Sequence, residues 1–117
     1  MTDHPIEIAP DSSQILRLQS NPSGSQVLCR LPAGQVSIPA RHKTITEFWY
    51  VLGGEGHLAI DEQVISLQRG AYAQIKPNEI FQFAAKQDLE ILITTLPPWP
   101  GDDEAETFDR GPLNDLY

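Results

Sequence analysis

Apolar and polar residues alternate along much of this chain with a period of two residues, which is the period of a half-buried β-strand. Val36 and Ile38 alternate with polar neighbours, although Pro39 confines such a strand to an edge or a bulge. Other stretches combine aromatic, β-branched and aliphatic residues, and they cover residues 26–31, 47–52, 58–60, 63–67, 71–75, 80–84 and 89–96. Turn residues separate these stretches, and none of them has a convincing helical period. The pattern therefore predicts about eight to ten short strands.

Many short strands joined by turns predict an all-β fold, either an antiparallel sandwich or a small barrel. Gly53-Gly54 can adopt the positive φ of a hairpin, so strand 47–52 is expected to turn back there. Residues 89–96 form the most continuous apolar run and are expected to be a strand that is covered on both faces.

The tail, residues 97–117, differs from the rest because it is rich in proline and acidic residues. Proline cannot donate to a ladder of hydrogen bonds, so the tail cannot form a central strand. Its aromatic residues Trp99, Phe108 and Tyr117 are costly to leave in water. Part of the tail is therefore expected to pack back on the barrel or on a second subunit.

Composition and charge narrow the classes of partner. The chain has 117 residues, which suits one domain, and its net charge of −8 argues against a nucleic-acid or anionic-membrane partner. No apolar run approaches the ~18 residues of a membrane span. Residues 1–13 lack the features of a signal peptide, and the single cysteine, Cys29, allows no internal disulfide. These features predict a cytoplasmic protein.

Two segments carry a resemblance to a known family. Gly34, five residues, Ala40-Arg41-His42, four residues, Glu47, six residues and Gly54 together resemble the first motif of the cupins. Residues 70–85 align with the second cupin motif. The resemblance implies one domain over residues 1–117, with a cupin-type antiparallel β-barrel, also described as a double-stranded β-helix or jelly-roll-like fold.

The same resemblance divides the domain into a barrel and an extension. The barrel is expected at residues 13–96, and the proline-rich acidic tail is expected to extend from it as residues 97–117. The ending PPWPGDDEA is similar to that of small bacterial cupins that are loosely described as mannose-6-phosphate isomerase-like.

In metal-binding cupins, three histidines and one glutamate hold an ion of iron, manganese, nickel or zinc. The resemblance implies that this chain keeps two of these ligands, His42 and Glu47, and has Ala40 and Phe81 at lost ligand positions. Two protein ligands rarely retain a transition metal, so no cofactor is favoured. The alternative is one divalent transition metal on His42 and Glu47, with further donors such as Gln74, Tyr72 or an exogenous carboxylate.

The competing interpretation is a metal-free pocket inside the barrel. Side chains alternate along a strand, so Glu47 shares a face with other residues of its own strand, and the phenylalanines of a second strand share another. The pocket is expected to be mostly apolar, which is typical of a small-molecule site. Its expected lining residues are Trp49, Val51, Gln74, Phe81 and Phe83.

His42 and Glu47 would form the polar pair of this pocket. Burial would raise the pKa of Glu47, and the pair could then move a proton as catalytic residues of an isomerase or epimerase. The bland alternative is a hydrogen-bonded remnant of an ancestral metal site, with Phe81 filling the space.

Three functions stay open at the level of sequence. The first is a barrel that binds a small-molecule ligand; the second is an enzyme, an isomerase, an epimerase or a metal-dependent oxygenase-like protein. The third is a structural or assembly barrel without chemistry of its own. A homodimer is expected because Phe48, Tyr50 and Trp99 are surplus apolar residues that need a cover.

Overall fold

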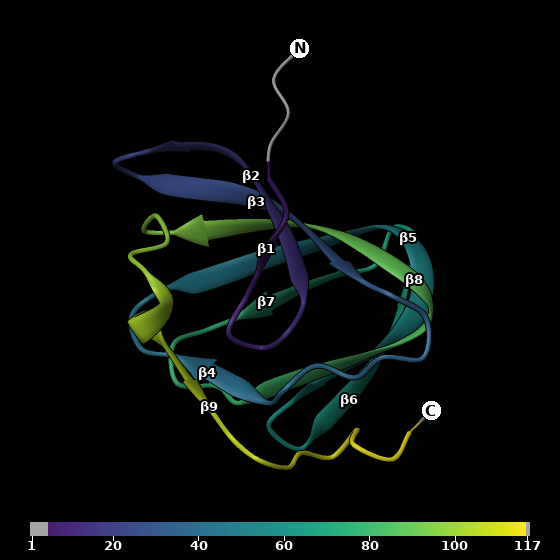
Figure 1. Cartoon of the computed structure of the whole chain (residues 1–117). Coiled ribbons are helices and arrows are strands. Elements are labelled where there is room, and N and C mark those ends of the chain that lie inside the picture. Colours follow the sequence, from purple (N-terminus) through teal and green to yellow (C-terminus); the bar gives the residue numbers. More distant parts are fainter. Residues whose placement is uncertain (1–4, 117) are drawn as a thin grey trace.

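The computed structural model describes residues 5–116, which form nine β-strands and one turn of 3₁₀-helix. Their bounds are β1 (Glu7–Ile8), β2 (Gln14–Asn21), β3 (Gly24–Leu31), β4 (Ala40–His42), β5 (Thr46–Ile60), β6 (Gln63–Gln68), β7 (Tyr72–Ile75), β8 (Phe81–Leu96), η1 (Asp102–Glu104) and β9 (Ala105–Thr107). All the pairings are antiparallel, and the sheet curls on itself into a barrel (Figure 1). The all-β barrel expected from the sequence is confirmed.

Two long strands organise the sheet. The strand β8 pairs with β5 along most of its length, from Ile60 opposite Phe81 to Thr46 opposite Leu96. The C-terminal half of β8 also pairs with β3 on its other side. β5 pairs in turn with β6 and β7, so β5 and β8 together touch most other strands of the described chain.

The expected hairpin at Gly53-Gly54 is wrong, because β5 runs through both glycines without turning back. The register of β5 against β8 shifts on both sides of Gly53, which is the signature of a bulge. Gly54 has φ +90°, and a Cβ atom there would lie 2.0 Å from the carbonyl oxygen of Asp88. The two glycines therefore bend a continuous strand, while the reversal of direction falls at Asp61-Glu62, between β5 and β6.

The stretches 80–84 and 89–96, expected as two strands, are joined in the single strand β8. The expectation that residues 89–96 are covered on both faces is also corrected. Ile91 and Ile93 are buried inside the barrel, whereas Leu92 and Thr94 are half-buried and line a groove on the outer surface. Only one face of this part of β8 is fully covered, because no second layer lies outside it in the described chain.

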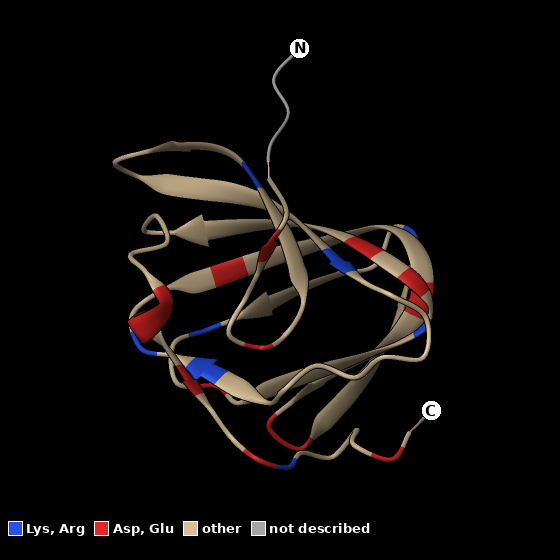
Figure 2. Cartoon of the chain, in the orientation of Figure 1, with Lys and Arg blue, Asp and Glu red and all other residues tan. Residues whose placement is uncertain are grey.

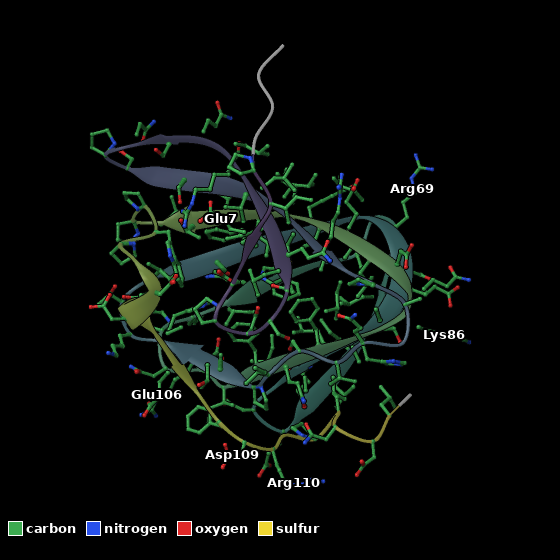
Figure 3. The ribbon with its side chains drawn as sticks, in the orientation of Figure 1. Glu7, Arg69, Lys86, Glu106, Asp109 and Arg110 are labelled. Atoms are coloured by element: carbon green, nitrogen blue, oxygen red, sulfur yellow. The ribbon has the colours of Figure 1, made fainter. Side chains whose placement is uncertain are left out.

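The core fills the interior of the barrel with side chains from β3, β5 and β8. The largest fully buried side chains include Phe81, Phe83, Leu58 and Ile91. Charged side chains such as Arg69, Lys86, Asp109 and Arg110 lie on the periphery, away from this core (Figure 3). None of the helical structure within residues 5–116 has the length and apolar character needed to cross a bilayer.

The tail packs on the barrel, as the sequence predicts. Its strand β9 lies beside β4 at the edge of the sheet (Figure 1), with Ala105 opposite His42. Leu113 is buried, and its backbone N–H donates to the side-chain oxygen of Gln82. Trp99 and Phe108 both contact residues of β4. The expectation for Tyr117 lies outside the described residues.

The bulge generates a prediction about stability. Gly54→Ala should lower the free energy of unfolding by more than about 2 kcal/mol, because the new Cβ meets the Asp88 carbonyl and the positive φ disfavours alanine. Gly53→Ala is the matched control, since nothing lies within 4 Å of its added Cβ, and it should change stability by less than about 0.5 kcal/mol. Urea unfolding measures both variants. Equal losses in the two would contradict the close approach at Gly54.

Candidate functional site

The site is built where β4 ends and β5 begins. His42 is the last residue of β4 and Glu47 is the second residue of β5, and both side chains are buried. The imidazole Nε2 of His42 lies 3.9 Å from Oε2 of Glu47. Ala40 lies on the same face of β4 as His42, because side chains two residues apart share a face, and it pairs with Phe81 of β8. The four positions named by the cupin motifs therefore come together.

Aromatic rings surround the polar pair. The indole Nε1 of Trp49 donates a hydrogen bond of 2.9 Å to Oε1 of Glu47. The ring of Phe81 lies 5.1 Å from the ring of His42 and 6.1 Å from that of Trp49, between centroids. Trp49 also makes an edge contact of 4.9 Å with Phe83. The carboxyl group is therefore held by one donor and otherwise faces apolar surroundings.

Burial decides the charge of the pair. It raises the pKa of Glu47 to about 8, and the hydrogen bond from Trp49 only partly offsets this rise. Burial also lowers the pKa of His42 to about 4, against a smaller opposing influence of Glu104. Near neutral pH the carboxyl group therefore keeps its proton and the imidazole is uncharged. The contact of 3.9 Å is one between neutral groups rather than an ion pair.

A cavity of about 50 Å³ lies against this pair. That volume exceeds what one water molecule needs, about 10–15 Å³, but falls well below the roughly 300 Å³ of a typical ligand pocket. The walls are mainly apolar, and they come from the barrel interior, the loop before β2 and the tail. The lining residues used below are His42, Glu47, Trp49, Phe81, Trp99 and Asp11.

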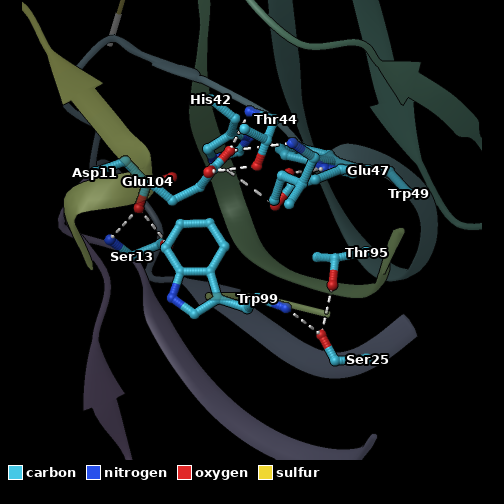
Figure 4. Close-up of polar contacts among 11 residues, drawn as sticks. Asp11, Ser13, Ser25, His42, Thr44, Glu47, Trp49, Thr95, Trp99 and Glu104 are labelled. Atoms are coloured by element: carbon cyan, nitrogen blue, oxygen red, sulfur yellow. Dashed lines mark hydrogen bonds and ion pairs between the residues drawn. The ribbon is translucent and has the colours of Figure 1, made fainter. Parts of the chain in front are cut away.

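Two buried polar atoms at the cavity have no hydrogen-bond partner. They are Nδ1 of His42 and Nε1 of Trp99, and the two rings lie edge to face with centroids 5.3 Å apart. Figure 4 shows the indole of Trp99 beside the hydrogen-bonded pair of Asp11 and Ser13. Buried nitrogens of this kind are nearly always paired in native proteins, so these two atoms call for a partner in the cavity.

The five residues expected to line the pocket fall into three groups: two line the cavity, two lie in the core and one lies on the outer surface. Trp49 and Phe81 line the cavity. Val51 and Phe83 are fully buried in the core on the same faces, but they do not reach the cavity wall. Gln74 is exposed on the outer surface of β7, so the inward direction expected for it is corrected.

Two acidic residues at the site, Asp11 and Glu104, were not expected from the sequence. The carboxylate of Asp11 accepts hydrogen bonds from the backbone N–H and the hydroxyl of Ser13, and burial raises its pKa. Glu104 of the tail accepts from the backbone N–H groups of Thr44 and Ile45 and from the Thr44 hydroxyl. Burial alone would raise the pKa of Glu104, but these hydrogen bonds lower it below its usual value. One sequence signal could have pointed to Glu104: it is an acidic residue in a tail that was expected to pack on the barrel.

The donor set does not fit the metal centre of metal-binding cupins. His42 and Glu47 supply two donors, Ala40 supplies none, and the ring of Phe81 fills the fourth position. Tyr72 and Gln74, the further donors considered above, both lie on the outer surface, and Tyr72 is 72% exposed. Among residues 5–116, no group of three or more His, Cys, Asp or Glu side chains could hold an ion.

The fold and the site place this protein among the antiparallel β-barrel proteins whose functional site lies inside the barrel. The family model for the cupin domain matches residues 27–95, more than half of the chain, so the chain belongs to the cupin family. The finer likeness to mannose-6-phosphate isomerase-like cupins stays a prediction. No curated protein matches the chain.

Solved structures agree with this assignment at the level of the fold. KdgF from Halomonas sp. superposes with a TM-score of 0.75 at 16% identity, over 83% of this chain and 89% of KdgF. Ectoine synthase from P. lautus gives 0.72 at 17% identity, over 92% and 83%. An RmlC-like cupin from Shewanella frigidimarina NCIMB 400 gives 0.71 at 21% identity, over 86% and 88%. Identities this low show a common fold alone.

The pKa of Glu47 generates a prediction about pH. A carboxyl group whose folded pKa is raised from 4.5 to about 8 stabilises the fold fully below pH 4.5 and loses that contribution as pH rises to about 8. For His42, whose pKa is lowered from 6.5 to about 4, stability instead rises with pH, and it does so between pH 4 and 6.5. Between pH 6.5 and 8, Glu47 therefore lowers the free energy of unfolding by up to about 1.4 kcal/mol per pH unit.

Glu47→Gln should remove this loss, because glutamine does not titrate and still offers an oxygen to Trp49. Urea unfolding at pH 6.5 and 8 measures the change for each variant. Glu62→Gln, at an exposed turn, is the control and should behave as the unmodified chain does. Parallel pH profiles for the unmodified chain and Glu47→Gln would contradict the raised pKa.

Proposed function

We propose that this cupin binds a small uncharged molecule inside its barrel, beside His42 and Glu47. The observation that carries the proposal is the unpartnered Nδ1 of His42, a buried polar atom on a residue that lines a mainly apolar cavity. A ligand atom that hydrogen-bonds to it would satisfy that nitrogen and fix the ligand's orientation.

The electrostatics of the site favour a neutral ligand. His42 and Glu47 are both uncharged near neutral pH, so neither attracts an ion. Arg17 reaches the cavity wall, but its guanidinium pairs with Glu7 at 2.7 Å. Binding of this kind needs no metal, which agrees with the incomplete donor set.

Filling the cavity tests the proposal. Ala40→Leu places three more carbons against the cavity beside His42, so it should weaken ligand binding at least about tenfold. Ala33→Leu is the matched control at an exposed position and should leave binding unchanged. The readout is the pair of indole N–H resonances of Trp49 and Trp99 while small uncharged ring compounds are added. A panel that shifts neither resonance would contradict the proposal.

Acid–base catalysis is the second candidate function, and the protonation of the pair favours it. Glu47 holds a proton near neutral pH while the neutral imidazole of His42 lies 3.9 Å away. One group could donate a proton and the other accept one, as an isomerase or epimerase requires. Ectoine synthase, among the structural neighbours, is an enzyme by its name, but its identity of 17% extends only the fold to this chain.

The distribution of charge bears on whether a nucleic acid is a partner. Figure 2 shows Lys and Arg on separate elements rather than along one stripe, and acidic residues outnumber them. A nucleic acid needs a continuous basic face, so we infer that none is a partner. The cytoplasmic location stays a prediction, and the buried free thiol of Cys29 is compatible with it.

The outer face of β5, β7 and β8 supports a homodimer. Phe48, Tyr50 and Tyr72 are 41%, 50% and 72% exposed there, and they line a groove of about 500 Å³. No lining residue of this groove is charged, although the chain carries a net charge of −8. Two acidic copies repel each other least through an uncharged face, so we infer that a second copy covers it. Trp99, also expected at an interface, lies at the barrel cavity instead.

Tyr72→Asp should convert the dimer to a monomer, because it buries two like charges where the copies meet. Val64→Asp is the matched control, since Val64 is 50% exposed on β6 outside the groove, and it should stay dimeric. Size-exclusion chromatography with light scattering measures the mass. A monomeric unmodified chain, or equal effects of both variants, would contradict the interface.

A further inference from the structure

Trp99 lies in the wall between the barrel cavity and a groove on the outer surface. The inner cavity of about 50 Å³ and an outer groove of about 190 Å³ have Trp99, Arg17 and Val27 in both their walls. The outer groove lies between the β2–β3 hairpin and the tail. The indole of Trp99 therefore lies, with these two side chains, between the inner cavity and the outer groove.

Hydrogen bonds hold the segment that carries Trp99 at two points, and the chain between these points pairs with no strand. On one side, the backbone N–H of Trp99 donates to the hydroxyl of Ser25 at 3.1 Å. On the other, the carboxylate of Glu104 is held by the loop that contains Thr44. Residues 97–101 form no helix or strand, and segments with few backbone hydrogen bonds open at low cost.

The indole fills its place without satisfying the polar atoms around it. Its own Nε1 is buried without a partner, and so is Nδ1 of His42, 5.3 Å away between ring centroids. A tryptophan that belongs to a settled core usually finds a partner for its N–H. The unpartnered Nε1 is therefore unusual for a tryptophan fixed in a core.

We propose that Trp99 is a displaceable plug, and that an uncharged ring compound of indole size with a hydrogen-bonding substituent can take the place of its indole against the cavity. The inference rests on the proposed function, because it assumes a ligand in the barrel. The ring would lie against apolar walls such as Val27 and Ile93, with His42 Nδ1 as its hydrogen-bonding partner. The substituent would reach the outer groove, whose wall includes the side chains of Gln19 and Gln26, which are hydrogen-bonded to each other.

The test removes the plug and supplies a ring. Trp99→Ala should bind indole, followed by calorimetry and by the indole N–H resonance of Trp49, while the unmodified chain binds indole at least about tenfold more weakly. Phe108→Ala is the matched control: Phe108 is another aromatic residue of the tail, but it lies against Arg41 outside the cavity. It should bind indole no better than the unmodified chain.

Each outcome bears on the plug separately from the pocket. Equal binding of indole by the unmodified chain and Trp99→Ala would overturn the plug and leave the barrel pocket intact. A folded Trp99→Ala that binds no indole would overturn the claim that a free ring can take the place of the Trp99 indole. Failure of the proposed function itself is a separate result, in which no compound of the panel binds the unmodified chain or is affected by Ala40→Leu.

A second measurement keeps the test valid if Trp99→Ala does not fold. The chain has two tryptophans, so in a Trp49→Phe background the fluorescence reports Trp99 alone. Glu104→Gln weakens the fastening to Thr44 and should increase quenching of Trp99 by acrylamide. Quenching that stays unchanged would overturn the plug, because Trp99 would then be fixed in place independently of the tail's fastening.

Discussion

The antiparallel pairing of β5 with β8 is the constraint on which the rest of this barrel depends. It brings Glu47 and Trp49 of one strand to the same interior as Phe81 and Phe83 of the other. At the bend, Gly54 lets the Asp88 carbonyl approach where any side chain would collide. Both strands can then serve two parts of the barrel wall, so a local glycine at a bulge decides the curvature that encloses the site.

Enclosure in turn sets the chemistry of the polar pair. In water His42 and Glu47 would attract each other as ions, but burial inside the barrel makes charge costly on both. The pair therefore rests as a protonated carboxyl group and a neutral imidazole near neutral pH. With Ala40 and Phe81 at the other motif positions, the barrel end resembles a small apolar pocket with two hydrogen-bonding groups more than a coordination site.

The tail forms part of the site. Glu104 replaces solvent as the partner of backbone N–H groups in the loop between β4 and β5, and β9 covers the edge of β4. An edge strand left open would expose unpaired backbone groups, so this cover stabilises the strand that carries His42. The same tail brings Trp99 to the cavity wall.

The sequence by itself determined the β-class, the cupin motif spacing and the inward direction of Glu47, Trp49 and Phe81, because alternation along a strand is a local property. It misjudged Gly53-Gly54, since a glycine pair permits a hairpin or a bulge and only the partner strand decides between them. It also misplaced Gln74, whose direction depends on the register of β7 against β5. Only the tertiary structure placed Trp99 and Glu104 at the site and neutralised the polar pair, because both follow from burial by residues distant in the chain.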